Sequence, residues 1–207
     1  SDPMQAEIKK FLHEDKALGE IKSARVNRYG IRKSIGKRDK PLEIEKYVVY
    51  DLWLGPAPAR PYHPCYHPWR WRDWWDFGTG QIGDLGCHKL STIFKALKLG
   101  SPTKIEAECD AVNPEIYPRV FNVHFEFPAR GDMPPVKLHW LSGGAQPPRP
   151  KGLEEGRRPS GDIMIGESGV LMGHRLVPET RMREYGLPPE VLARSPGHDK
   201  EFVDACR

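Results

Sequence analysis

The sequence lacks the features that mark several large protein classes. Its four cysteines stand at positions 65, 87, 109 and 206, and no two of them form a C-x-x-C pair. This pattern argues against a zinc ribbon and against a disulfide framework, and it suits a reducing compartment, so we expect a cytoplasmic protein. No stretch approaches the roughly 18 apolar residues that a membrane helix needs, and the first twenty residues have the pattern of an amphipathic helix, not of a secretory signal. We therefore expect no membrane partner.

A strong excess of charge of one sign is also missing. The 207 residues carry a formal net charge of +4, which does not by itself indicate nucleic-acid binding. Residues 21–40 are locally basic, with eight Lys or Arg against one acid, but beyond Tyr29 they offer no aromatic platform for bases. A strand followed by a solvated basic loop is favoured over a phosphate-binding segment. We expect no nucleic-acid partner.

The hydrophobic patterning that is present predicts an α+β fold. Strands with one apolar and one polar face are expected in 21–30, 103–112, 120–129 and 136–144. In the second of these strands the apolar face carries Ile105, Ala107, Cys109 and Ala111. A hairpin is expected in 162–173, with its turn at Gly166–Gly169. Helical spacing predicts helices over 4–18, 80–99, 189–193 and 198–207. We expect a single domain of residues 1–207: an open, mostly antiparallel sheet with helices packed on one face.

Residues 41–77 differ from the rest of the chain. They hold five of the six tryptophans, and five prolines stand between positions 56 and 68, which predicts a long ordered loop. The tryptophans could fasten this loop to the sheet, and one or two could line a cleft for a polar substrate, since Arg70, Arg72, Asp73 and Asp76 are interleaved with them. His63, Cys65 and His67 alternate as metal ligands can, but no fourth ligand has usable spacing. Loop packing is favoured over a metal site.

The stretch Gly78–Lys89, G-T-G-Q-I-G-D-L-G-C-H-K, contains a literal G-x-G-x-x-G. In a dinucleotide-binding fold this motif follows a buried strand, opens a helix, and precedes by about 20 residues an acidic residue at the end of a second strand. Here W-R-W-R-D-W-W-D-F precedes it, and Leu99-Gly100-Ser101-Pro102 lies 20 positions on. Only the helix requirement is met. We expect these glycines to permit close packing at a helix start and to bind no cofactor.

Two polar residues follow the glycines. Asp84 and His88 are four apart, so they share one helix face, which Ser91 continues. A carboxylate one turn from an imidazole can set the orientation and pKa of that imidazole, which suits general acid–base chemistry near neutral pH. The same spacing is also typical of a surface ion pair, and the residues alone leave both interpretations open.

The central stretch Y-D-L-W-L-G-P-A-P-A-R-P-Y-H-P-C-Y-H-P-W-R-W-R-D-W-W-D-F-G-T-G-Q-I-G-D-L-G-C-H strongly resembles the Gfo/Idh/MocA oxidoreductases, which include glucose–fructose oxidoreductase and inositol dehydrogenase. The resemblance is greatest to a bacterial branch, and it continues into G-E-S-G-V-L-M-G and H-D-K-E-F-V-D-A-C-R. It implies the C-terminal domain of such an enzyme, acting on a sugar, polyol or glycoside. It further implies that NAD or NADP binds to an N-terminal Rossmann domain absent from this chain, and that the sheet mediates homo-oligomerisation.

The resemblance also implies roles for single residues. The D-x-x-x-H pair of the family falls on Asp84 and His88, with His88 as acid–base on a substrate hydroxyl and Asp84 orienting it or binding substrate. Ser91 stands where many members carry an aspartate. The Glu-Lys-Pro of the family belongs to the Rossmann domain, so Asp39-Lys40-Pro41 is interpreted as an accidental match. The expected substrate contacts are His67, Arg70, Trp75 and Gln81. A non-catalytic carbohydrate-binding or oligomerisation module on the same fold is the alternative.

Overall fold

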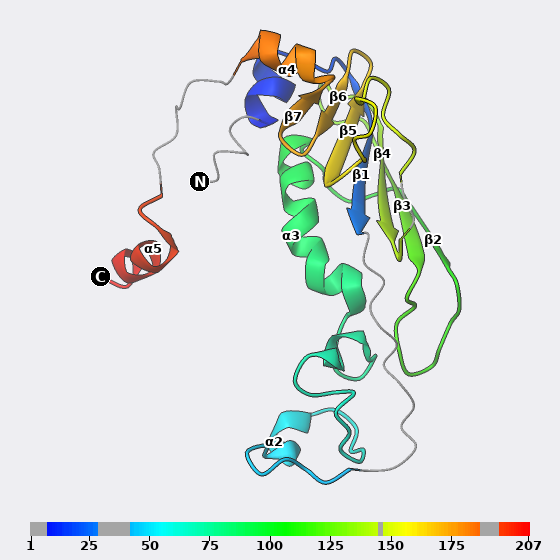
Figure 1. The fold of residues 1–207 in the computed structure, drawn as a ribbon, viewed down its shortest axis with the longest axis vertical. Helices are drawn as coiled ribbons and strands as arrows, with labels where there is room; N and C mark the ends of the chain where they lie inside the picture. The colour runs from blue at the N-terminus through cyan, green and yellow to red at the C-terminus, as the bar shows by residue number, and fades with distance from the viewer. Residues whose placement is uncertain (1–7, 29–41, 145–146, 187–194) are drawn as a thin grey trace.

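A computed structural model describes residues 8–28, 42–144, 147–186 and 195–207 (Figure 1). Seven strands form one sheet in the order β2-β3-β4-β1-β5-β6-β7. Their bounds are β1 Ile21–Arg28, β2 Lys104–Cys109, β3 Phe121–Phe127, β4 Val136–Ser142, β5 Asp162–Gly166, β6 Val170–Met172 and β7 Arg175–Val177. Every neighbouring pair is antiparallel except β1 and β4, which run parallel. The predicted open, mostly antiparallel sheet is confirmed.

Helical segments are few. They are the π-helical turn η1 Lys10–Glu14, α2 Tyr50–Leu54, the 3-10 turn η2 Arg70–Asp73, α3 Gly80–Ala96, α4 Glu179–Tyr185 and α5 His198–Ala205. The predicted helix over 80–99 therefore ends three residues early, and the first helix is a π-helical turn where it is described. The helix expected over 189–193 and the tripeptide Asp39-Lys40-Pro41 lie outside the described residues. No helix in the described ranges is long and apolar enough to cross a membrane.

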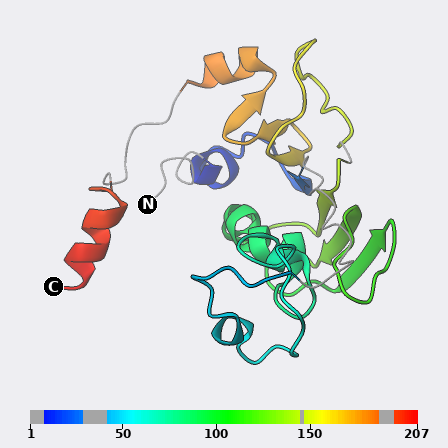
Figure 2. The same cartoon turned by 60° about the horizontal axis from the view of Figure 1, so that its bottom comes forward.

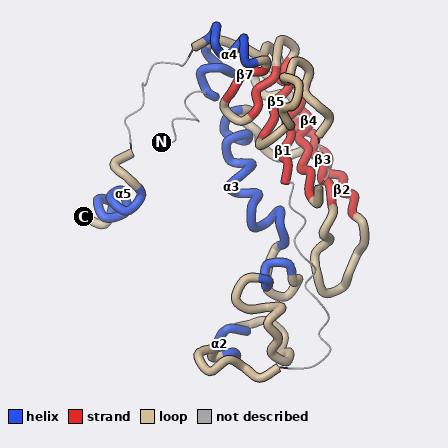
Figure 3. The backbone as a smooth tube through the Cα atoms, viewed as in Figure 1, coloured by secondary structure: helices blue, strands red, loops and turns tan. Residues whose placement is uncertain are grey.

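The main core lies on one side of the sheet, here called the helix face, against which α3 runs (Figures 1 and 3). Trp140 of β4 and Ala24 of β1 are fully buried there with Ile93 of α3. Leu171 and Leu176 of the last hairpin continue this core. The opposite side, here called the outer face, carries Ser23 and Arg25 of β1 in alternation with the buried set. The period-two pattern therefore translates directly into two unlike faces.

The edge strand β2 corrects one expectation. Ile105, Ala107 and Cys109 pair with β3 on the helix face as predicted, but all three are exposed, Ile105 to 59%. The core that joins α3 to the sheet includes residues of β1, β3 and β4 and none of β2. The apolar alternation in β2 therefore identifies a strand correctly, whereas its burial depends on whether a helix reaches the sheet edge.

The Trp/Pro-rich segment forms a separate lobe beyond the first turn of α3 (Figures 1 and 2). Its own small core consists of Cys65, Tyr66 and Trp74, with Trp53, Phe77 and Ile116 packed around it. The tryptophans thus fasten the loop mainly to itself, whereas fastening to the sheet had been expected. The connection is made by the β2–β3 loop, where the Trp75 N–H donates to the Glu115 carbonyl at 3.0 Å and the Tyr117 N–H to the Asp73 carbonyl at 2.9 Å.

Candidate functional site

The space beside the glycines at the start of α3 is occupied by the protein's own atoms. A Cβ at Gly78 would overlap the backbone of Arg72, and one at Gly83 would overlap the side chain of Thr79. Gly80 has a φ of +64°, and a Cβ there would lie 2.7 Å from the ring of Tyr117. A phosphate-binding glycine loop needs open backbone that a pyrophosphate can approach. These glycines are covered and follow a loop, so they do not fit a dinucleotide; their packing role is as predicted.

Asp84 and His88 lie one turn apart on α3, but the structure gives Asp84 a different partner. Its Oδ1 accepts a hydrogen bond from Nε of Arg72 at 3.3 Å, and both side chains are about two-thirds or more buried, with 31% and 26% exposure. The His88 side chain is exposed and has no hydrogen-bond or ion-pair partner among the described residues. Ser91 lies further along the same helix and is half-buried. The predicted shared face exists, and a guanidinium from η2 joins it.

Arg72 is held in place by aromatic rings. Its guanidinium carbon lies 4.5 Å from the ring centroid of Trp71 and 5.3 Å from that of Trp69, and Nη1 donates to the Trp69 carbonyl at 3.3 Å. A guanidinium stacked on aromatic faces keeps its in-plane donors free for a carboxylate. In the sequence, Arg72 stands out only as one charge among the tryptophans. The arginine–tryptophan alternation was the available signal, but it does not reveal which carboxylate Arg72 meets.

Two of the expected substrate contacts have other partners in the structure. Gln81 is 7% exposed, and its side-chain carbonyl accepts a hydrogen bond from the Ser142 hydroxyl of β4, which fastens α3 to the sheet. Trp75 is 45% exposed; its indole N–H donates to the Asn113 carbonyl at 2.9 Å, and its ring lies on that of Tyr117. Trp75 therefore presents one ring face from the lobe, while Gln81 points into the core. Their roles toward substrate remain predictions.

His67 lies in the lobe shortly before η2, and Arg70 is the first residue of η2. His67 is half-buried with its ring edge-on to Trp53, at 6.0 Å between centroids. Arg70 is exposed in the same turn as Arg72, which brings it to the start of α3. His63 Nδ1 accepts a hydrogen bond from the Cys65 N–H at 3.1 Å, a local turn contact. Within the described ranges, no group of three or more potential ligands is arranged to hold a metal ion.

The site therefore combines one accessible base with a fixed ion pair. An exposed imidazole can accept or return a proton near neutral pH. The carboxylate one turn earlier is oriented by Arg72, and its charge is compensated by that arginine. In such an arrangement the His88 imidazole can take a proton from a substrate hydroxyl. The Asp84 carboxylate can accept a hydrogen bond from a neighbouring hydroxyl, and the Arg72 guanidinium can donate one to it.

Comparison with known proteins relates part of the chain to a family. Residues 28–128 match the Gfo/Idh/MocA family description "Oxidoreductase family, C-terminal alpha/beta domain", which confirms the predicted resemblance. No curated protein matches the chain.

Among solved structures, one similar chain is an oxidoreductase from Agrobacterium radiobacter, solved in complex with NAD+, L-tartaric acid and magnesium, at 18% identity and a TM-score of 0.39. Our chain is covered to 94% and that chain to 46%. Another is yvaA from Bacillus subtilis, described as belonging to the oxidoreductases, at 16% identity and a TM-score of 0.42, with 91% and 40% covered. The chain thus spans less than half the length of these proteins.

Proposed function

Because residues 28–128 match the C-terminal alpha/beta domain of the Gfo/Idh/MocA oxidoreductases, we propose that this chain is the substrate-side domain of an NAD(P)-dependent oxidoreductase. The proposed substrate is a sugar, polyol or related glycoside. The observation that carries the proposal is the exposed His88 imidazole, one helical turn from a carboxylate that Arg72 holds in place. Hydroxyl-rich substrates suit this set, because it offers a base, an acceptor and a fixed cation.

In the proposed mechanism the substrate lies between the exposed face of α3 and the lobe that carries Trp75. His88 takes the proton of the reacting hydroxyl and returns it in the reverse direction. Arg72 keeps Asp84 oriented, so that Asp84 can accept a hydrogen bond from an adjacent hydroxyl. The glycines of this chain do not fit a dinucleotide, so we place NAD or NADP in a separate N-terminal Rossmann domain. The 207 residues alone are then expected to be inactive.

The test uses the complete protein that contains this chain. Nicotinamide reduction is measured with a panel of polyols and sugars, and the best substrate is then used with the His88→Ala variant. We expect kcat to fall by about 100-fold or more, the usual contribution of a general base. His174→Ala, which removes an exposed histidine of the β6–β7 turn, serves as the matched control and retains full turnover. Unchanged kcat in His88→Ala, or full activity of residues 1–207 alone, would overturn the proposal.

The alternative is a carbohydrate-binding or oligomerisation module without catalysis. Two features favour it: Asp84 forms an ion pair with Arg72, and position 91 carries a serine where many family members are expected to carry an aspartate. The two functions differ in cofactor dependence. Calorimetric titration of NAD and NADP into the complete protein, followed by the sugar panel, distinguishes them, because only the oxidoreductase binds the cofactor and converts the sugar.

We also propose that two copies of the chain pair through the β2–β4 half of the outer face of the sheet. The β2–β4 half of that face carries the charged pairs Lys104–Glu106, at 2.8 Å, and Lys137–Glu126, at 3.2 Å, from which a self-complementary surface can be built. Light scattering across a concentration series measures the mass. A strict monomer at the highest concentration contradicts pairing, and a dimer that Lys137→Glu dissociates supports it.

A further inference from the structure

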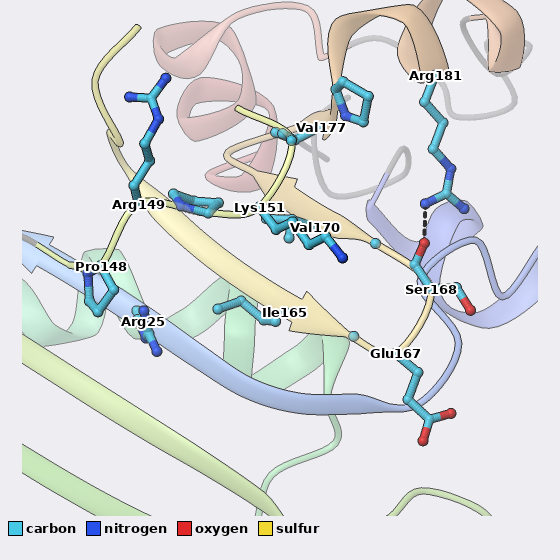
Figure 4. Close-up of a pocket in the computed structure, with 15 residues that line it drawn as sticks. Arg25, Pro148, Arg149, Lys151, Ile165, Glu167, Ser168, Val170, Val177 and Arg181 are labelled. Atoms are coloured by element: carbon cyan, nitrogen blue, oxygen red, sulfur yellow. Dashed lines mark hydrogen bonds between the residues drawn. The ribbon is translucent and has the colours of Figure 1, made fainter. Parts of the chain in front are cut away.

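A cavity of about 700 Å³ lies on the outer face of the sheet, away from α3 and the Asp84–His88 face (Figure 4). Its floor is formed by Ile165 of β5, Val170 of β6 and Val177 of β7. The alternate residues of the same strands, Met164, Leu171 and Leu176, belong to the core on the helix face. The segment 148–152 lines one side of the cavity. Its volume is within the range of small-molecule sites.

Four cations border this apolar floor. They are Arg25, Arg149, Lys151 and Arg181. The single acid on the cavity lining, Glu167, is paired with Lys22 at 3.0 Å and points away from the floor (Figure 4). Arg25 and Lys151 have no hydrogen-bond or ion-pair partner in the described part of the chain. The positive charge of the rim is therefore not compensated from within the cavity.

The other two arginines are bound to neutral groups. Arg149 donates to the carbonyls of Leu153 at 2.9 Å, Glu154 at 2.5 Å and Arg157 at 2.7 Å. Arg181 donates to the carbonyls of Ser168, at 2.5 Å, and Ala17. Carbonyls satisfy the N–H donors of a guanidinium but leave its charge in place. Arg149 and Arg181 thus fix the walls and add to the positive field.

The cavity is also preformed. The Arg181 guanidinium crosses directly over Gly169, where a Cβ would overlap it, and Gly152 in the segment 148–152 has a φ of +84°. The three carbonyl contacts of Arg149 hold that segment in place. A site whose walls are held in this way loses little conformational entropy when a ligand enters.

We propose that this cavity binds a small organic anion, with its acid group paired with Lys151, with Arg25 adding to the positive field of the rim, and with its apolar body on Ile165, Val170 and Val177. The site is independent of the proposed oxidoreductase function, because it lies on the opposite face of the sheet. An extended polyanion such as nucleic acid fits poorly, since the cations surround an apolar floor and do not form a track.

Isothermal titration with three probes tests the proposal on residues 1–207 or on the complete protein. Hexanoate combines the anion with the apolar body, 1-hexanol lacks the charge, and inorganic phosphate lacks the apolar body. We expect hexanoate to bind at least about tenfold tighter than hexanol, the factor typical of hydrogen bonds to a charged group. It should also bind more tightly than phosphate.

Two variants locate the binding. Lys151→Gln and Arg25→Gln are each expected to weaken hexanoate binding by about fivefold or more. Lys95→Gln, which removes an exposed lysine of α3 on the other face, leaves it unchanged. Circular dichroism is used to check that all three variants are folded. Lys151→Gln changes only an exposed loop residue, so we expect it to fold as the wild type does. Equal binding of hexanoate and hexanol, binding of phosphate alone, absence of binding by all probes, or insensitivity to both cavity variants would each overturn the proposal.

Discussion

At the scale of single residues, the candidate site depends on which partner each charge finds. Asp84, which was expected to orient His88 or to bind substrate, is joined in the structure to Arg72, whose guanidinium rests on two indole rings. The carboxylate is thereby fixed, while the imidazole is left accessible. An ion pair that remains about a quarter exposed on each side is screened by solvent, so its contribution to stability is small.

We expect a double-mutant cycle of Arg72→Gln and Asp84→Asn to give a coupling energy of about 0.5–1 kcal/mol. Denaturant unfolding of the two single variants and the double variant provides the measurement. The pair Lys200–Asp204 in α5, at 2.7 Å and more exposed, serves as the comparison and should couple less. Strictly additive single variants at positions 72 and 84 would show that the pair does not form in solution.

Asp162 at the start of β5 is a half-buried acid with a buried, unsatisfied oxygen. Its Oδ1 has no hydrogen-bond partner in the described structure, and burial raises the pKa of this carboxyl although Lys89 opposes the shift. A raised folded-state pKa means that ionisation costs stability: the penalty is absent below the unfolded pKa of 3.8 and develops as the pH rises through the folded value.

Asp162→Asn is therefore expected to stabilise the fold at pH 7, by on the order of 1 kcal/mol. The advantage should shrink as the pH falls, because the folded wild-type chain takes up the proton of this carboxyl at a higher pH than the unfolded chain does. Thermal unfolding at several pH values measures this difference. Glu155→Gln, an exposed acid in the preceding loop, is the control and should change little at any pH. A variant that is less stable than the wild type at pH 7 contradicts the argument.

At the scale of elements, the start of α3 shows how glycines join a loop to a helix. The backbone of Arg72 packs against Gly78, whereas Gly86 has only ordinary neighbours, the nearest 3.7 Å from an added Cβ. Two glycines of one segment thus have opposite sensitivities to the same substitution.

Gly78→Ala is expected to destabilise the protein by about 1–3 kcal/mol, because the methyl group overlaps backbone that cannot move aside cheaply. Gly86→Ala should instead stabilise by about 0.5–1 kcal/mol, since alanine is the better helix former and space is available. The two variants serve as each other's control in urea unfolding. Equal effects of the same sign would mean that close packing does not explain the glycines.

The register of β3 against β4 creates a second titratable element. His124 and His139 are directly paired across the strands, with 2.5 Å between their Nδ1 atoms. Burial lowers the pKa of His139, and His124, Arg25 and Lys137 lower it further. A lowered folded-state pKa means that the unfolded chain binds the proton more readily, so stability is lost as the pH falls below the unfolded value of 6.5.

We expect the melting temperature to fall between pH 7.5 and pH 5, and to fall less in His139→Gln. Glu106 faces this pair from β2, and its hydrogen bond with Lys104 lowers the pKa of its carboxyl, while Glu126 neighbours the pair on β3. His13, half-buried in η1, is replaced in the control variant His13→Gln, which should retain the wild-type pH dependence. A His139→Gln profile that is superimposable on the wild type would refute the assignment.

At the scale of the whole molecule, separate hydrophobic cores stabilise separate parts of the chain. The large core joins α3, η1 and α4 to the helix face, while the lobe of residues 42–77 has its own small core around Trp74. The lobe contacts the rest through η2, the start of α3 and the β2–β3 loop. Local loss of the lobe core should therefore spare most of the sheet.

Trp74→Ala is expected to lower hydrogen-exchange protection across residues 42–77 and the first turns of α3, with β1, β4 and β5 protected as before. Trp140→Ala, by contrast, empties a fully buried position of the main core and should cost about 3–5 kcal/mol throughout the molecule. Exposed Trp69 provides the control variant, Trp69→Ala. Uniform loss of protection in Trp74→Ala would show that the lobe and the sheet unfold together.

Local patterns in the sequence determined most of the longer strands and the long helix of this protein. Alternation of apolar and polar residues identified β1 to β4 and the turn at Gly166–Gly169, because strand geometry alone sends successive side chains to opposite faces. Helical spacing placed Asp84 and His88 on one face of α3 for a similar reason. The short strand β7 and helix α4 were not foreseen, since three and seven residues carry too little periodicity.

Tertiary structure alone decided the contacts between distant segments. The parallel pairing of β1 with β4, the exposure of Ile105 and the partnership of Arg72 with Asp84 all depend on where segments meet in space. The cavity of Figure 4 likewise combines β1, β5–β7 and the 148–152 segment. Sequence periodicity describes only the direction of a side chain from its own element. Which neighbour it meets there is set by packing, because burial and ion pairing are properties of the assembled fold.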